Sequence, residues 1–246
     1  MLFSILLERI AIMALLMAVG VYLSRKGFLS EQGSRDLGAI LLRIIIPCVI
    51  IKSYITEYSH QRLLELGLSA LLALISYVVA MLLSYLVFGQ RRRLENFAAA
   101  FCNAGFIGIP LVQAVGGQEG GFYIAASGAL LNLFQWTYGV YIMTGRKDTI
   151  SPKAIARNPV VISIVIGVAL FLSRVTLPGI LTSTLGYVAD MNTPVAMILM
   201  GTYLARLPLR RMLDRRAVGC VLMRLVVIPA AVGLVFWLMP VDNLPL

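Results

Sequence analysis

Residues 103–110 read NAGFIGIP and lie inside a stretch apolar enough to sit within a lipid bilayer. Pro110 lacks a backbone N–H and kinks a helix, while Gly105 and Gly108 add conformational freedom and let another chain approach closely. Asn103 brings an amide with donors and acceptors to the same place. Because a helix in lipid tolerates such residues only where neighbours, water or a cavity satisfy the freed backbone groups, the stretch predicts a broken membrane helix with an amide at the break.

The composition of the whole chain is that of a membrane protein. Of its 246 residues, 60% are hydrophobic and 13% are charged, whereas soluble domains are about 45–50% apolar and about 25% charged. The net charge of +10 argues for nucleic acid only if it forms one basic face, and here the cations lie in short clusters between apolar runs, so no nucleic-acid partner is expected. The three cysteines are far apart, without disulfide or metal-ligand spacing, and no metal or cofactor is expected.

Eight apolar runs have about the 20 residues that a helix needs to cross the hydrocarbon core. The loops between them are short, and the glycine-rich GGQEGG at 116–121 predicts a turn. The expected fold class is therefore an all-α polytopic membrane protein with about eight transmembrane helices. The predicted spans are 3–23, 37–56, 64–88, 97–116, 121–144, 158–174, 180–204 and 217–239.

Positive charges set the predicted orientation of these spans. Most of the 21 lysines and arginines lie in alternate loops, after the first, third, fifth and seventh spans, and such loops stay in the cytoplasm. Both termini are therefore predicted to lie outside the cytoplasm. The alternation also supports 97–116 as a real crossing, because removing that span would disrupt it. We expect a multi-pass protein of a bacterial-type plasma membrane, with the lipid bilayer as a partner.

A weak internal repeat relates the two parts of the chain. Pro47 in the second span aligns with Pro194 in the seventh at an offset of 147 residues, and the same offset matches the first span with the sixth and the third with the eighth. An odd number of spans per repeat makes the repeats inverted, as in many secondary transporters. We expect a first five-helix repeat at 1–145 and a partial second repeat of three helices at 146–246, without copies of the fourth and fifth spans.

Ionisable and polar residues within the predicted spans are candidate functional positions. Arg43 and Arg224 each suit a cationic counter-charge for an anion. The alternatives are a structural pair between Arg43 and Asp190, which the repeat offset places opposite each other, and an arginine that snorkels to the interface. Asn132 either lines a cavity next to Asn103 or bonds to another helix.

Three stretches resemble the auxin efflux carrier family, which includes the plant PIN-type carriers and bacterial malate- or malonate-permease-like proteins. The family's first crossover region is similar to residues 101–139, FCNAGFIGIPLVQAVGGQEGGFYIAASGALLNLFQWTYG. The opening of its sixth helix is similar to residues 157–172, RNPVVISIVIGVALFL, and its seventh helix to residues 193–205, TPVAMILMGTYLA. With the eight spans, the resemblance covers essentially the whole chain.

The resemblance implies ten helices in two inverted repeats, with the fourth and ninth helices broken and crossing near the midplane, and a small organic anion as substrate. It places the family's substrate-binding crossover asparagine on Asn103 and its crossover proline on Pro110. Since a ninth and a tenth helix are absent here, three explanations are open. The sequence is a fragment, the gene is truncated, or a homodimer or partner polypeptide supplies the missing helices.

The leading hypothesis is a secondary transporter, an efflux carrier or permease for small organic anions such as carboxylates, that uses alternating access at the broken helix. The alternative is a non-transporting membrane subunit or receptor-like protein, or a truncated fragment of such a carrier. An enzyme is not expected, because the sequence has no HExxH, no GxSxG and no paired carboxylates within helical reach.

Overall fold

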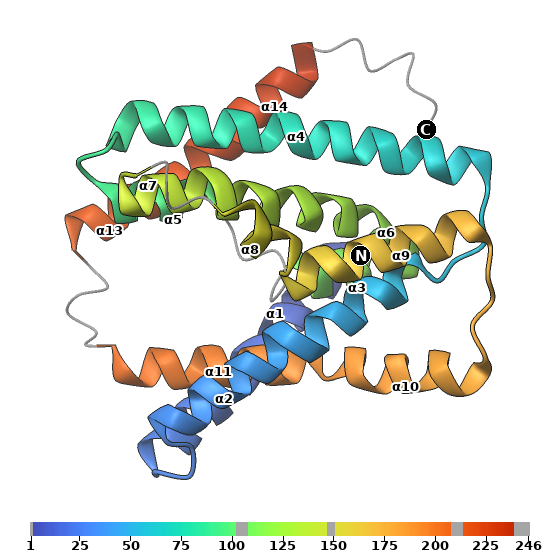
Figure 1. Cartoon of the computed structure of the whole chain (residues 1–246). Coiled ribbons are helices and arrows are strands. Elements are labelled where there is room, and N and C mark those ends of the chain that lie inside the picture. The colour runs from blue at the N-terminus through green and yellow to red at the C-terminus, as the bar shows by residue number, and fades with distance from the viewer. Residues whose placement is uncertain (1, 102–107, 147–150, 208–213, 239–246) are drawn as a thin grey trace. The chain divides into compact units, whose positions relative to one another are not determined.

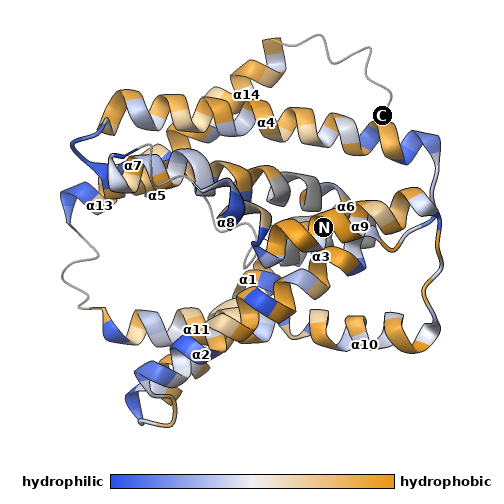
Figure 2. Cartoon of the chain, viewed as in Figure 1, coloured by the Kyte–Doolittle hydropathy of each residue, from blue (hydrophilic) through white to orange (hydrophobic). Residues whose placement is uncertain are grey.

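The computed structural model describes residues 2–101, 108–146, 151–207 and 214–238, and the regular elements in these ranges are all helices (Figure 1). Apolar residues run along the helices, and hydrophilic residues gather mainly at helix ends and turns (Figure 2). The prediction of an all-helical, polytopic membrane protein is confirmed at this level.

Four helical segments of the described ranges are long and apolar enough to cross a membrane, and they coincide with the first, second, third and eighth predicted spans. The first and third are α1 (Leu2–Arg25) and α4 (His60–Phe88). The second comprises α2 (Glu31–Ile40), the π-helical turn η1 (Leu41–Ile45) and α3 (Ile46–Tyr54). The eighth comprises α13 (Arg215–Leu222), the π-helical turn η5 (Met223–Val227) and α14 (Ile228–Leu238).

The other predicted spans are formed by shorter helices. The sixth is the apolar helix α9 (Pro159–Ser173), which follows the short helix α8 (Pro152–Ala156). The fourth and fifth contain α5 (Arg93–Ala100), α6 (Ile109–Phe134), η3 (Gln135–Gly139) and α7 (Val140–Thr144). The seventh contains α10 (Gly179–Asp190) and α11 (Asn192–Arg206), with Met191 between them.

The prolines of the second and seventh spans change the helix locally without ending the span. Just before Pro47, the N–H of Ile46 donates to the carbonyl of Leu41, five residues back. The proline ring crowds the carbonyl of the preceding turn, and a π turn relieves this because its hydrogen bonds reach five residues back instead of four. In the seventh span the helix resumes at once, because Val195 N–H donates to Met191 O at 3.0 Å. Pro47 therefore marks a wide turn rather than a broken helix.

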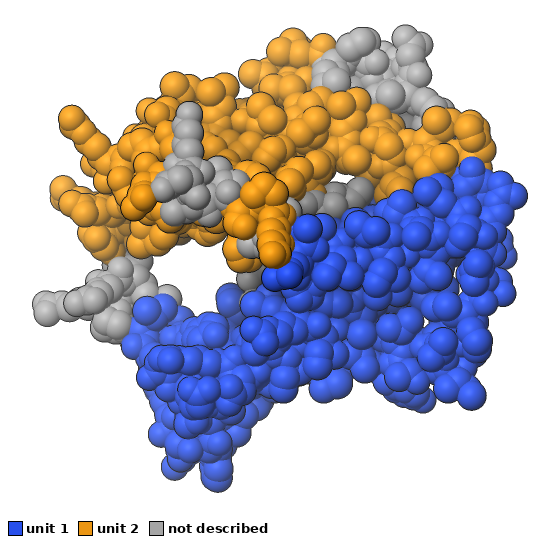
Figure 3. All heavy atoms as spheres, in the orientation of Figure 1, with its two compact units in different colours: residues 1–59, 103–125, 156–207 blue, residues 60–102, 126–155, 208–246 orange. Residues whose placement is uncertain are grey.

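The chain forms two compact units, which Figure 3 colours separately. Unit 1 contains residues 1–59, 103–125 and 156–207, and unit 2 contains residues 60–102, 126–155 and 208–246. Unit 1 thus holds the first, second, sixth and seventh predicted spans, whereas unit 2 holds the third, the eighth and α5. Each of the predicted repeats contributes helices to both units.

In unit 1, two glycines allow α1 and α11 to pack with their backbones in contact. A Cβ atom added to Gly20 would lie 2.1 Å from the carbonyl oxygen of Ile198, and one added to Gly201 would lie 2.1 Å from that of Met17. Close approach through small residues is a common way for helices to associate in lipid.

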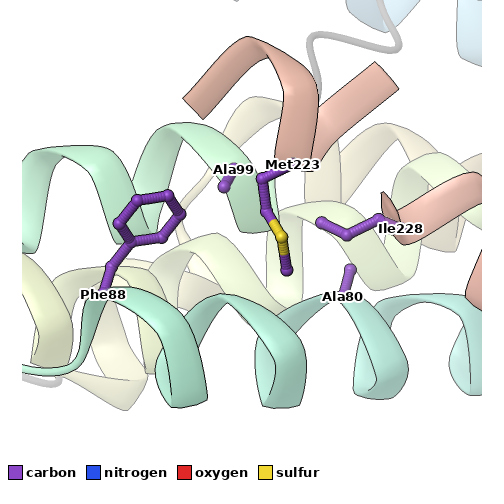
Figure 4. Packing of buried hydrophobic residues seen from close by; sticks show 5 residues of the cluster. All are labelled: Ala80, Phe88, Ala99, Met223 and Ile228. Carbon is purple, nitrogen blue, oxygen red and sulfur yellow. The ribbon is translucent and has the colours of Figure 1, made fainter. Parts of the chain in front are cut away.

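The core of unit 2 joins α4, α5 and the eighth span. The side chains of Ala80, Phe88, Ala99, Met223 and Ile228 are buried and point toward one another (Figure 4). Met223 and Ile228 are five residues apart, which in a regular α-helix would place them about 140° apart around the axis. The π turn of η5, in which Ile228 N–H donates to Met223 O, brings both onto one face.

Candidate functional site

The predicted break in the fourth span is visible at the end of α5. Helix α5 ends at Ala100, and Phe101 has an extended backbone with φ −113° and ψ 131°. Helix α6 begins at Ile109, directly after Gly108, which is half-buried and in a π-helical turn. Asn103 and Gly105, the other candidates in this stretch, lie outside the described residues.

Pro110 is the second residue of α6, and Gly108, two residues earlier, is in a π-helical turn. A π turn also precedes Pro47. Pro110 therefore lies at a local change of the helix, where the backbone bonds of the turn before a proline are redirected.

A turn at Gly117 follows the break and lies within the predicted GGQEGG turn. Gly117 has φ 60° and ψ −149°, which is not a helical conformation. In a continuous helix, residues eight apart are separated by about 12 Å along the axis, yet a Cβ added to Gly120 would lie 2.7 Å from Val112 O. The chain therefore reverses at Gly117, and the first residues of α6 form a short arm packed against the residues that follow.

Arg224 lies at the end of α5. Its Nη1 atom donates to the carbonyl oxygens of Ala99 at 3.2 Å and Ala100 at 3.3 Å. These are the last carbonyls of α5, and the C-terminal end of a helix carries a partial negative charge. The half-buried guanidinium therefore caps the end of α5, and its role toward a substrate stays a prediction.

A second polar contact set that the sequence analysis missed orients α5. The fully buried Asn96 donates from Nδ2 to Gly89 O at 3.0 Å and accepts from the hydroxyl of Tyr138 at 3.1 Å. On another side of α5, the thiol of Cys220 donates to Glu95 O at 3.5 Å. The sequence carried one signal for this contact set, because Asn96 stands between the arginines at 91–93 and an apolar run.

The predicted pair of Arg43 and Asp190 is wrong. Asp190 accepts from Lys52 Nζ at 2.9 Å, whereas Arg43 is exposed and makes no hydrogen bond or ion pair with any residue that the structure describes. Lys52 and Arg43 are nine residues apart, about 13 Å along a helix. Helix α10 contacts α3 at its Lys52 end, which puts the carboxylate out of reach of Arg43.

Asn132 bonds within its own helix. Its Nδ2 atom donates to Gly128 O, one turn earlier in α6, at 2.9 Å, and the side chain is half-buried. The alternative in which it bonds to another helix is therefore not seen. In the described ranges, no group of three or more histidine, cysteine, aspartate or glutamate residues could hold a metal ion.

A comparison with protein families identifies the class of this chain. The family model described as "Membrane transport protein" matches residues 5–154 and 149–244. The chain belongs to the membrane transport protein family. This membership confirms the resemblance to auxin efflux carriers. Members of the membrane transport protein family are transporters rather than enzymes, so the chain is an integral membrane protein that carries a small-molecule substrate. No individual curated protein matched the sequence.

Proposed function

We propose that this membrane transport protein is a secondary transporter of small organic anions such as carboxylates. The observation that carries the proposal is the interruption of the fourth span at Phe101, whose extended backbone follows the end of α5 at Ala100. The first turn of a helix has free backbone N–H groups and a partial positive charge, and both attract carboxylates. A helix that begins inside a membrane span offers these groups to an anion away from bulk water.

The residues that we propose for binding are the candidates that the sequence predicts. From its residue type, Asn103 offers an amide N–H₂ to a carboxylate oxygen. Gly105 and Gly108 lack a Cβ, which would let an anion approach the backbone closely, and Pro110 is the second residue of α6. Arg224 adds a positive charge at the end of α5, and Asn132 is a further polar candidate.

The proposed mechanism is alternating access, which requires bodies that keep their own packing while the binding site changes its exposure. Each compact unit has such packing of its own. Unit 1 contains the close contact of α1 with α11, and unit 2 contains the cluster around Met223.

We retain the inverted repeat in the proposal, with repeats at 1–145 and 146–246. Support comes from the grouping of matched spans, because the offset of 147 residues pairs spans that share a unit. The first and sixth, and the second and seventh, lie in unit 1, while the third and eighth lie in unit 2. A homodimer belongs to the same proposal.

The test is uptake of radiolabelled malate and malonate into proteoliposomes that contain the purified chain. We expect uptake by the wild type and its loss in Asn103→Ala, with membrane insertion and thermal unfolding unchanged. The matched control is Asn158→Ala, because Asn158 caps α9 by accepting from Val160 N–H at 2.9 Å and has no proposed contact with substrate. Normal uptake by Asn103→Ala would remove this residue from the site. No uptake of either acid by the wild type would favour a non-transporting subunit.

A further inference from the structure

The connection between α1 and α2, residues 25–30, is a tight turn of defined shape within unit 1 (Figure 1). Gly27 has φ 77°, a left-handed conformation that glycine adopts without strain just after a helix ends. Leu29 N–H then donates back to Leu23 O at 3.2 Å, and Ser30 caps the start of α2 with its side chain. The α1–α2 turn is therefore held by hydrogen bonds at both of its ends.

The α1–α2 turn presents an apolar ring and two cations outward. Phe28 is 73% exposed, and its ring centroid lies 6.5 Å from that of Tyr22, which is also exposed. Arg25 and Lys26 are exposed and make no hydrogen bond or ion pair with any residue in the described part of the chain. The turn thus leaves two positive charges without a counter-charge next to exposed aromatic rings.

The other charged groups near the start of α2 already have partners. Glu31 pairs with Arg35 on the same helix, and Asp36 accepts from a glutamine side chain one turn earlier at 2.9 Å. Arg206, at the end of α11, donates to the hydroxyl of the buried Ser34 at 2.9 Å. Neither carboxylate therefore neutralises the cations of the α1–α2 turn, and this end of unit 1 keeps a net positive charge.

The α1–α2 turn lies where the first span meets the membrane surface. The apolar segment that is long enough to cross the membrane ends at Arg25, so the turn comes directly after it. Aromatic side chains favour this interface, and cations there attract anionic headgroups. A lipid satisfies both features at once, because its phosphate suits the cations and its apolar part covers the ring. A small soluble anion would leave Phe28 in water.

We propose that the α1–α2 turn is a binding site for the headgroup of an anionic phospholipid. Arg25 and Lys26 bind the phosphate with charge-assisted hydrogen bonds, and Phe28 inserts beside the lipid. The positive-inside rule predicts that this lipid belongs to the cytoplasmic leaflet. The site is independent of the transported substrate and of the proposed function.

The experiment measures lipid selectivity at the turn itself. Phe28→Trp, in a full chain that also carries Trp136→Phe and Trp237→Phe, places a single fluorophore there. The protein is reconstituted into vesicles of phosphatidylcholine and phosphatidylglycerol, and bromine on the acyl chains of one of the two lipids quenches the fluorophore on contact. We expect phosphatidylglycerol, which is anionic, to bind about tenfold more strongly than phosphatidylcholine, as two cations beside an anionic lipid allow.

Adding Arg25→Gln and Lys26→Gln to this chain should bring the ratio of the two binding constants close to one. Its thermal unfolding in detergent should be unchanged, because neither side chain has a partner among the described residues. The matched control is Arg215→Gln with Arg216→Gln, another adjacent pair of exposed arginines, at the start of α13 in unit 2. The control should keep the selectivity for phosphatidylglycerol.

Each of three results would overturn the inference. Equal quenching by the two lipids, or none by either, would show that the turn does not select an anionic lipid. An equal loss of selectivity in the control would assign it to the overall charge of the protein. Loss of selectivity on adding millimolar inorganic phosphate would indicate a site for a soluble anion. Since no transported substrate is used, these results leave the proposed function untouched.

Discussion

Single residues decide how closely the helices of each unit approach. Gly201 on α11 leaves no room for a side chain, because an added Cβ would lie 2.1 Å from a backbone oxygen of α1. Backbone atoms cannot move aside as the end of a flexible side chain can. In unit 2 the fully buried Asn96 holds α5 by hydrogen bonds to Gly89 O and to the hydroxyl of Tyr138.

We expect Gly201→Ala to destabilise the protein by about 1–3 kcal/mol, because an atom is forced into a packed contact. The measurement is thermal unfolding of the purified protein in detergent. Gly219→Ala is the control, since its Cβ would meet nothing within 4 Å and alanine favours the helix. Equal stabilities of the two variants would contradict the close packing of α1 with α11.

We expect Asn96→Leu to lower the stability by about 1–3 kcal/mol, because the half-buried Gly89 O loses its hydrogen-bond donor. The hydroxyl of Tyr138 loses Asn96 as an acceptor but can still donate to Met81 O at 3.4 Å. Tyr138→Phe removes one of these bonds and leaves the other, so it should cost less. Chemical denaturation in detergent compares the two variants. A Tyr138→Phe variant less stable than Asn96→Leu would show that Asn96 does not organise this contact set.

At the scale of elements, local backbone chemistry creates the irregular places in the spans. Extended backbone at Phe101 ends α5, and Gly117, with its positive φ, turns α6 back on itself. Wide π turns precede Pro47 and Pro229. Irregular backbone therefore occurs at proline and glycine, the residue types least suited to a regular helix, and at Phe101.

We expect Gly117→Ala to destabilise the turn by about 1–2 kcal/mol, because φ 60° is strained for any residue with a Cβ. Gly128→Ala, in the same helix, has nothing within 4 Å of its added Cβ and should be neutral or stabilising. The temperature of thermal unfolding and the rate of malonate uptake should both fall in Gly117→Ala and stay unchanged or rise in Gly128→Ala. Wild-type stability of Gly117→Ala would contradict the reversal at this glycine.

At the scale of the whole molecule, charge and hydropathy determine orientation in the membrane. The predicted cytoplasmic loops contain most of the lysines and arginines, and the positive-inside rule predicts the orientation from this bias. The loop between α3 and α4 is then predicted to face outward, and the loop between α4 and α5 to face the cytoplasm.

We expect a cysteine at Ser59 to react with a membrane-impermeant maleimide in intact cells, and one at Arg91 to react only after permeabilisation. Both variants need a background in which the native cysteines are replaced by alanine. Labelling in the reverse pattern would contradict the predicted orientation while leaving the fold intact.

The sequence by itself determined the features that depend on local physics. Apolar runs predicted the long helices, and the Gly and Pro residues between 103 and 121 predicted the break and the glycine turn, because hydropathy and the backbone limits of these residues need no distant partner. Local patterns do not predict everything, as Pro47 shows. The sequence placed this proline within the second span, but it did not predict the π turn that precedes it.

Only the tertiary structure decided the pairing of polar side chains. Asp190 pairs with Lys52 rather than with Arg43, and Arg224 donates to the last carbonyls of α5. Asn96 is buried between Gly89 and Tyr138. These partners depend on which faces of distant helices meet, and a rotation or a shift of one turn along a helix changes them. Since the two partners are often more than 100 residues apart, no local pattern specifies the contact.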